Sequence, residues 1–195
     1  MPEKPFVIER KKNGGGKWLE LEILSYRDHL GRNRTWECAT RVNSRGAVMM
    51  VAQLKPGGKL VLIRQFRPPA DNFVIEFPAG LIDDGESPAE TAVRELYEET
   101  GLRGQVTQII PPALNSPGLS GESITTVMMT VDETLPENAN PVPQFEDSEN
   151  IETFLIYPEN LTSFIDKATI RGDRIDAKII TFITGMSLQS GIVKD

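Results

Sequence analysis

The segment from Ser87 to Gly101 constrains the fold more than any other part of the chain, because it specifies a helix at both ends. Ser87-Pro88-Ala89-Glu90 is a capping box with proline at the first helical position. Gly101 is a natural helix end. At about 100° per residue, one narrow stripe of this helix collects the residues expected to pack on the core, which are Ala89, Ala92, Val93, Leu96 and Thr100.

Carboxylates gather beside this stripe. Glu95 and Glu99 are one helical turn apart on its margin, and Glu98 lies further from the core. Two such charges about 6 Å apart repel by about 3 kcal/mol at an effective dielectric of 20. Arg94 lies four residues from both Glu90 and Glu98 and can pair with either, and we expect it to neutralise Glu98. Glu95 and Glu99 therefore still require a cation.

Oxygen ligands without histidine or cysteine favour Mg²⁺ or Mn²⁺, with substrate phosphates completing the coordination shell. A solvated acidic helix face is the alternative interpretation. The helix alone leaves both interpretations open.

Histidine and cysteine are too scarce to carry other common chemistries. The single cysteine, Cys38, excludes an intrachain disulfide and a cysteine-rich zinc site. The single histidine, His29, lies in a turn-like segment, which favours an exposed turn over a Ser-His-Asp triad. We therefore expect any catalysis to depend on carboxylates.

Charge and apolar patterning exclude several classes of partner. The chain has 28 acidic and 21 basic residues, a net charge of −7, and no basic run, which argues against nonspecific nucleic-acid binding. Its apolar runs are far too short to span a membrane. Residues 1–5 lack the apolar core of a signal peptide, so we expect a cytoplasmic protein.

Strands surround the central helix in the sequence. The first sixteen residues end in three glycines and are predicted to form a flexible arm, and residues 135–150 form a long stretch without periodicity. Residues 158–190 carry apolar residues at helical spacing. This organisation predicts a mixed α/β (α+β) domain. The expected strands are Trp18–Ile23, Arg34–Val42, Ala47–Lys55, Lys59–Arg67, Phe73–Phe77, Val106–Ile110, Ile124–Val131 and Ile151–Tyr157.

The glycine and acid spacing around the helix is highly specific. From Gly80 the chain reads five residues to Glu86, seven more to Arg94-Glu95-Leu96, then Glu98-Glu99 and Gly101-Leu102. This pattern resembles the Nudix box of the Nudix hydrolases at every fixed position. The resemblance implies metal-dependent cleavage of a nucleoside diphosphate linked to another moiety, within mixed sheets sandwiched by helices. It assigns metal binding to Glu95, Glu99 and the Ala79 carbonyl, and orientation of these ligands to Arg94 and Glu98.

Segments outside the box resemble the ADP-sugar pyrophosphatase subfamily, notably Gln65–Pro69 and Ile75–Glu86. In that subfamily an N-terminal strand region exchanges across a homodimer, and two tryptophans sandwich adenine. The resemblance therefore implies a strand arm over residues 1–45, a catalytic domain over residues 46–195, and adenine stacking by Trp18 and Trp36. Both tryptophans could instead be core or interface anchors.

Other side chains are candidates for the rest of the substrate. Arg67 and Arg41 suit a diphosphate because a planar guanidinium matches paired phosphate oxygens. The resemblance places Glu37 against the adenine amino group and Leu81 in the substrate site. Surface ion pairing is the alternative for the two arginines and Glu37.

The catalytic base is expected in the loop before the last strand. A carboxylate outside the helix should take a proton from the attacking water. Alignment with the family favours Glu149, and Glu146, Asp147, Glu152 and Glu122 are the other candidates.

These features predict Mg²⁺-dependent hydrolysis of ADP-ribose and related ADP-sugars to AMP and a sugar phosphate. One alternative is a diphosphatase for oxidised nucleoside diphosphates such as 8-oxo-dGDP. The other is a module that binds nucleotide sugars without cleaving them, against which the intact set of Glu95, Glu98 and Glu99 argues.

Overall fold

A computed structural model describes residues 3–145, 150–189 and 191. The chain divides into two compact units. The first comprises Met1–Ala47 with Pro111–Thr125, and the second comprises Val48–Ile110 with Thr126–Asp195. The predicted division into residues 1–45 and 46–195 stays a prediction, and each unit is described separately.

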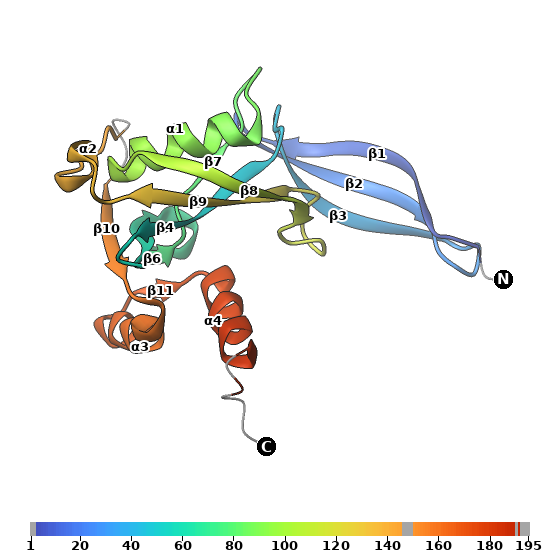
Figure 1. The fold of residues 1–195 in the computed structure, drawn as a ribbon. Helices are drawn as coiled ribbons and strands as arrows, with labels where there is room; N and C mark the ends of the chain where they lie inside the picture. The colour runs from blue at the N-terminus through green and yellow to red at the C-terminus, as the bar shows by residue number, and fades with distance from the viewer. Residues whose placement is uncertain (1–2, 146–149, 190, 192–195) are drawn as a thin grey trace. The chain divides into compact units, whose positions relative to one another are not determined.

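The first unit is built on a three-stranded antiparallel sheet of β1 (Phe6–Gly15), β2 (Leu19–Arg27) and β3 (Asn33–Arg41) (Figure 1). The predicted flexible arm is therefore wrong, since most of it is β1. Opposite charges face each other across β1 and β2, where Arg10 contacts Glu22 at 3.3 Å and Lys12 contacts Glu20. These ion pairs help to hold β1 in register with β2, although the three glycines had suggested a mobile segment.

The β2–β3 connection is an exposed turn organised by Asp28. Its carboxylate accepts the backbone N–H groups of Leu30 and Arg32, both at 2.9 Å, and the side chains of Arg32 and Arg34 at 3.1 Å. These hydrogen bonds hold the pKa of Asp28 well below its usual range. His29 lies exposed in this turn, which confirms that prediction.

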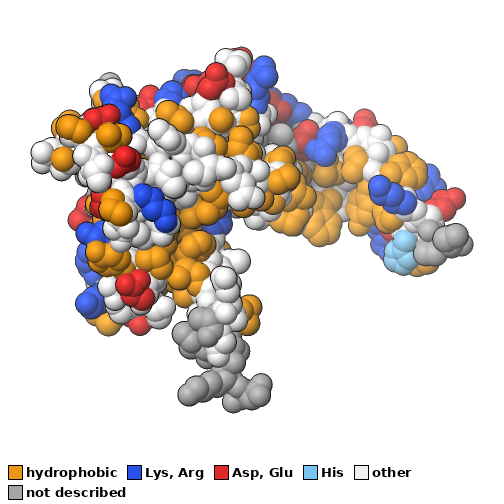
Figure 2. Space-filling model, viewed as in Figure 1, with side chains coloured by type: hydrophobic (Ala, Val, Ile, Leu, Met, Phe, Trp, Pro, Cys, Tyr) orange, Lys and Arg blue, Asp and Glu red, His pale blue; other side chains and the backbone are white. Residues whose placement is uncertain are grey.

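The three-stranded sheet buries little apolar surface. Figure 2 shows apolar side chains exposed along these strands between charged ones. Within the described chain, every residue of β1 is exposed. The exposed large apolar residues of this sheet are Phe6, Val7, Ile8, Leu19, Leu21 and Trp36. A surface of this kind favours contact with another protein surface.

The second unit contains a mixed sheet covered by helices, which confirms the predicted fold class (Figure 1). The strand order is β11-β6-β5-β4-β9-β8, with β10 on β5 and β7 on β4. The strands are β4 (Ala47–Lys55), β5 (Leu60–Arg67), β6 (Asn72–Glu76), β7 (Ala79–Leu81), β8 (Gly104–Leu114), β9 (Ser123–Asp132), β10 (Ile151–Ile156) and β11 (Arg174–Ile175). The α-helices are α1 (Pro88–Thr100), α2 (Pro136–Ala139), α3 (Leu161–Arg171) and α4 (Ala177–Gln189).

Helix α1 packs on the core of this unit through Ala92 and Leu96, against alternate residues of β4 and β9. The predicted stripe is shifted, because Val93 is exposed whereas Glu99 is buried. Strand β7 lies against the helix on the side of Glu95 and Glu99, so this edge is covered by backbone. The core-facing stripe thus includes a carboxylate.

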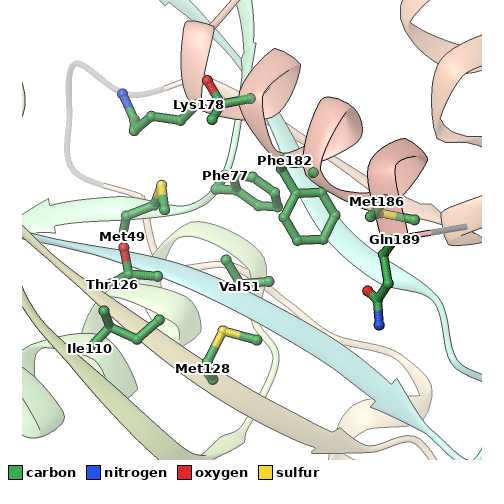
Figure 3. A pocket seen from close by; sticks show the side chains of 12 residues that line it. Met49, Val51, Phe77, Ile110, Thr126, Met128, Lys178, Phe182, Met186 and Gln189 are labelled. Carbon is green, nitrogen blue, oxygen red and sulfur yellow. The ribbon is translucent and has the colours of Figure 1, made fainter. Parts of the chain in front are cut away.

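Helix α4 lies over the opposite side of the sheet and leaves a cavity of about 530 Å³ beneath it (Figure 3). The lining is mainly apolar and includes Met49, Met128 and Met186. Phe182 of α4 packs edge-on against Phe77, with ring centroids 5.4 Å apart. Because Phe77 immediately precedes Pro78-Ala79, this contact supports the turn that leads into β7.

No helix among the described residues is long and apolar enough to cross a membrane. The cytoplasmic location stays a prediction.

The capping box predicted for α1 is present, with Ser87 and Glu90 bonded reciprocally at 2.8 and 3.3 Å. We expect Ser87→Ala to lower the free energy of unfolding by about 1 kcal/mol, because it leaves helix N–H groups without an acceptor. The melting temperature should fall by roughly 2–4 °C. Thermal unfolding followed by circular dichroism measures this shift. Thr162→Ala, at an exposed position of α3, is the control, and equal shifts in both variants would contradict the cap assignment.

Candidate active site

The acidic edge of α1 is organised around the guanidinium of Arg94. Its Nη1 donates to Glu95 at 2.8 Å and to Glu98 at 3.0 Å. Its Nε and Nη2 donate to the two carboxylate oxygens of Glu86, each at 2.8 Å. The predicted pairing of Arg94 with Glu98 is therefore present. The same cation also holds two further carboxylates.

Glu86 is the member of this network to which sequence reasoning gave no role. It lies in the loop before α1, and its side chain also accepts the Thr91 hydroxyl at 2.8 Å. Hydrogen bonds from Arg94 lower the pKa of Glu86 to about 2, so it stays ionised at neutral pH. The signal that could have identified it was its fixed position six residues after Gly80.

Strand β7 brings its backbone against the carboxylates of α1. A Cβ atom at Gly80 would lie 1.9 Å from Cδ of Glu95, so a side chain there would displace this carboxylate from its present position. The Ala79 N–H donates to Glu99 at 3.1 Å, and Glu99 is only 3% exposed. The predicted metal ligands Ala79, Glu95 and Glu99 are thus brought together by β7 and α1.

The donor set fits a hard divalent cation. No cluster of three histidine, cysteine or acidic side chains among the described residues is arranged to hold a metal. The candidate set instead combines two carboxylates with a backbone carbonyl, and such oxygen donors suit Mg²⁺ or Mn²⁺. The space kept open at Gly80 lets the Glu95 carboxylate lie directly against the backbone beside Ala79.

Arg67, predicted to bind a diphosphate, lies at the end of β5 and contacts Glu76 of β6. Its Nε donates to one carboxylate oxygen at 2.6 Å and its Nη2 to the other at 3.1 Å. Burial acts to lower the pKa of Arg67, but the hydrogen bonds and charge of Glu76, with the charges of Glu99 and Asp176, raise it overall. Arg67 therefore lies near the acidic side of α1 and stays charged. Leu81 is exposed, and its carbonyl accepts Nη2 of Arg94 at 3.3 Å.

The predicted adenine-binding residues all lie in the first unit. Trp18 is 66% exposed and Trp36 is 51% exposed, so neither is a core residue of the described chain. Nε1 of Trp36 donates to the Gly118 carbonyl at 3.1 Å, and the ammonium of Lys17 lies 4.3 Å from the Trp18 ring centroid. Glu37 lies exposed on β3, directly after Trp36.

Arg41 pairs with Glu122 in the same unit, with Nε and Oε1 2.9 Å apart. The two residues line a polar cavity together with Arg10, Arg45, Ser44 and Ser123. Glu122, one of the candidate bases, is thus engaged by a cation.

The favoured candidate base, Glu149, lies outside the described residues, as do Glu146 and Asp147. Glu152 is on β10 and lies 3.6 Å from Arg64. The described neighbours on both sides of this segment are fixed. Gln144 donates its N–H to the Glu98 carbonyl at 2.8 Å and its side chain to the Tyr97 hydroxyl at 3.0 Å. Ile151 pairs with Gln65 on β5.

Comparison with known proteins identifies this arrangement. The model of the NUDIX domain matches residues 43–175. The chain is 36% identical to the ADP-ribose pyrophosphatase of Saccharomyces cerevisiae, over 95% of this chain and 85% of the relative. It is 33% identical to the ADP-sugar pyrophosphatase of Mus musculus, over 96% and 89%.

The fold is also found in a solved structure. A crystal structure of an ADP compounds hydrolase superposes with a TM-score of 0.71 at 20% identity, over 98% of this chain and 97% of that chain. This likeness concerns the fold alone.

We expect Gly80→Ala to weaken binding of Mn²⁺ by about tenfold or more, because the added methyl group displaces the Glu95 carboxylate. Isothermal titration calorimetry with Mn²⁺ measures this loss, and circular dichroism checks that the fold is retained. Gly185→Ala is the matched control, since a Cβ at that position meets no atom within 4 Å. Unchanged Mn²⁺ affinity in the Gly80 variant would contradict the placement of the metal site.

Proposed function

The chain belongs to the Nudix hydrolase family, and on that premise we propose that it cleaves the pyrophosphate bond of ADP-ribose and related ADP-sugars. The products are AMP and a sugar phosphate. The observation that carries this proposal is the set of carboxylates that α1 holds against Ala79 and Gly80. The names of the relatives from Saccharomyces cerevisiae and Mus musculus support the choice of substrate class.

Mg²⁺ is the proposed cofactor, held by Glu95, Glu99 and the Ala79 carbonyl. A bound divalent ion supplies charge neutralisation to the phosphates and lowers the pKa of a water molecule. Arg94 keeps Glu95 oriented through the contacts that also hold Glu86 and Glu98. In the second unit, Arg67 is proposed to bind diphosphate oxygens, and Arg41 of the first unit is a separate candidate for contacts to phosphate.

Glu149 is proposed as the base that takes a proton from the attacking water. Support comes from its flanks, since Gln144 is bonded to α1 and Ile151 is paired with β5. Both anchors belong to the elements that carry Glu98 and Arg67. Glu152 is a weaker candidate because it lies beside Arg64, and Glu122 is held by Arg41.

Adenine is proposed to stack between Trp18 and Trp36, with about 1–3 kcal/mol gained per stacking contact. The spacing of the two backbones along the strand favours a separate chain for each face. The Val42 N–H donates to the Trp18 carbonyl, and Val42 lies six residues beyond Trp36 along the same strand direction. At about 3.4 Å per residue the two tryptophans are roughly 20 Å apart, whereas rings that sandwich a base lie about 7 Å apart.

A homodimer satisfies this requirement if Trp18 comes from one copy and Trp36 from the other. The apolar residues exposed on β1 and β2 supply a surface for such an association. Dimerisation therefore belongs to the proposed substrate site.

We expect rapid hydrolysis of ADP-ribose with Mg²⁺ to AMP and ribose 5-phosphate. The assay uses ¹⁸O-labelled water and mass spectrometry, with ADP-glucose, GDP-mannose, 8-oxo-dGDP and NADH as the panel. The position of the label identifies the attacked phosphorus. Consumption of 8-oxo-dGDP in place of ADP-ribose would favour the diphosphatase alternative, and a bound but unconverted ligand would favour the binding module.

Glu99→Gln should nearly abolish turnover in the same assay and leave the circular dichroism spectrum unchanged, because it removes one proposed metal ligand. Glu159→Gln, at an exposed position, is the control and should retain full activity. Retained activity in the Glu99 variant together with tight metal binding would overturn the ligand assignment.

Mixing two inactive variants tests the shared adenine site. Trp18→Ala and Trp36→Ala each damage both sites of a homodimer. Random re-pairing places about half of the chains in mixed dimers, where one of the two sites keeps both tryptophans, so about a quarter of all sites are restored. We expect a corresponding gain in ADP-ribose hydrolysis after mixing. Absence of any gain, with mixed dimers visible by native mass spectrometry, would contradict the shared site.

A further inference from the structure

The contact between Arg67 and Glu76 fixes the orientation of the guanidinium. Two separate donors, Nε and Nη2, meet the two oxygens of a single carboxylate at 2.6 and 3.1 Å. Such a two-point contact sets the plane of the guanidinium as well as its position. The anchor is the buried partner, since the side chain of Glu76 is 11% exposed and that of Arg67 is 39% exposed. The held cation therefore remains open to a ligand.

Glu76 occupies a position where an apolar residue would be expected. It ends β6 opposite Ile63 of β5, and its neighbours Ile75 and Phe77 are almost completely buried. A carboxylate in such surroundings costs free energy unless a cation compensates it. Well-packed apolar residues often replace a buried ion pair without loss of stability. The presence of this pair therefore points to a role beyond holding the strands together.

Competing carboxylates make the orientation of Arg67 matter. Glu99 and Asp176 are near enough for their charges to act on Arg67 as well. The two-point contact with Glu76 therefore decides which of these acids the guanidinium is bonded to.

Donor counting shows what the contact leaves available. A guanidinium carries five N–H groups, and Glu76 accepts two of them. Three remain, and they include both N–H groups of Nη1. Because the Nε–Nη2 edge is engaged by Glu76, the remaining donors lie in the same fixed plane and point away from that edge.

We propose that Glu76 is a positioning residue for the hydrolysis of ADP-ribose. It holds Arg67 so that the remaining N–H groups face the diphosphate, and it acts only through Arg67 without touching the substrate. This inference rests on the proposed function and deepens it. Glu76 also lies three residues before Ala79, so one short segment carries both the anchor of the phosphate-binding arginine and a proposed metal ligand.

A double-mutant cycle tests the inference in the absence of turnover. Binding of ADP-ribose is measured by calorimetry in EDTA for wild type, Arg67→Ala, Glu76→Gln and the double variant. Glutamine has the shape of glutamate but turns an N–H donor toward the arginine, so the two-point contact is lost. We expect about tenfold weaker binding in Arg67→Ala and about fivefold weaker binding in Glu76→Gln. The double variant should bind no more weakly than Arg67→Ala alone.

Steady-state kinetics with Mg²⁺ supply a second readout. Glu76→Gln should raise KM for ADP-ribose by a similar factor, and Glu76→Asp should recover part of the loss because it restores the charge. Asp173→Asn is the matched control. Asp173 is also a buried carboxylate bonded to an arginine, with Arg64 Nε at 3.0 Å, and it belongs to the same unit. That variant should lower the melting temperature without changing KM.

Three results overturn the inference. Additive losses in the double variant would mean that Glu76 acts independently of Arg67, and unchanged binding in Glu76→Gln would mean that it has no positioning role. Equal effects on KM in Asp173→Asn would indicate a general structural effect. If wild type cleaves another panel compound and not ADP-ribose, the proposed function fails alone, and the same cycle with that compound decides the role of Glu76. If it binds no panel compound, both proposals fail.

Discussion

The dominant constraint on this structure is the compensation of negative charge beside an apolar core. Helix α1 places Glu95, Glu98 and Glu99 within one turn of each other, and Glu99 is buried. Arg94 offsets one of these charges, and it bonds Glu95 and Glu98 together with Glu86 of the preceding loop. The position of β7 is linked to the same acids, because its backbone lies against Glu95 and donates the Ala79 N–H to Glu99. A single cation thus organises the helix, the preceding loop and the neighbouring strand.

Arginine–carboxylate pairs recur wherever a substrate-binding role is proposed. Arg67 is held by Glu76, and Arg41 is held by Glu122 within the other unit. The two pairs differ in geometry, since the first is a two-point contact with a buried acid and the second is a single contact. When a guanidinium is already paired with an acid, the pair carries little net charge, but the free N–H donors have a fixed orientation. The proposed recognition of a diphosphate by these arginines therefore depends on geometry, which suits a substrate that must be aligned with attacking water.

The sequence was sufficient for the local features and insufficient for the long-range ones. The capping box, the end of α1 at Gly101 and the pairing of Arg94 with Glu98 are contacts between residues a few positions apart, where spacing determines geometry. The composition of the first sixteen residues did not predict β1, because its order comes from pairing with β2, and only the family resemblance implied a strand arm there. The burial of Glu99 and the exposure of Val93 were missed because the approach of β7 decides which helix edge is covered. The contact between Arg67 and Glu76 joins the adjacent strands β5 and β6, and the residue pattern of either strand alone does not predict it.

Gly80 illustrates a requirement that is spatial and not conformational. Its backbone lies outside the positive-φ region, so every amino acid could adopt the local chain conformation. What excludes a side chain is the volume already occupied by the carboxylate of Glu95, fifteen residues later in the chain. Residues 80 and 95 therefore compete for one small volume, and a side chain at position 80 would take the space that the Glu95 carboxylate now fills. The glycine of β7 thus sets where a proposed metal-binding carboxylate on the helix can lie.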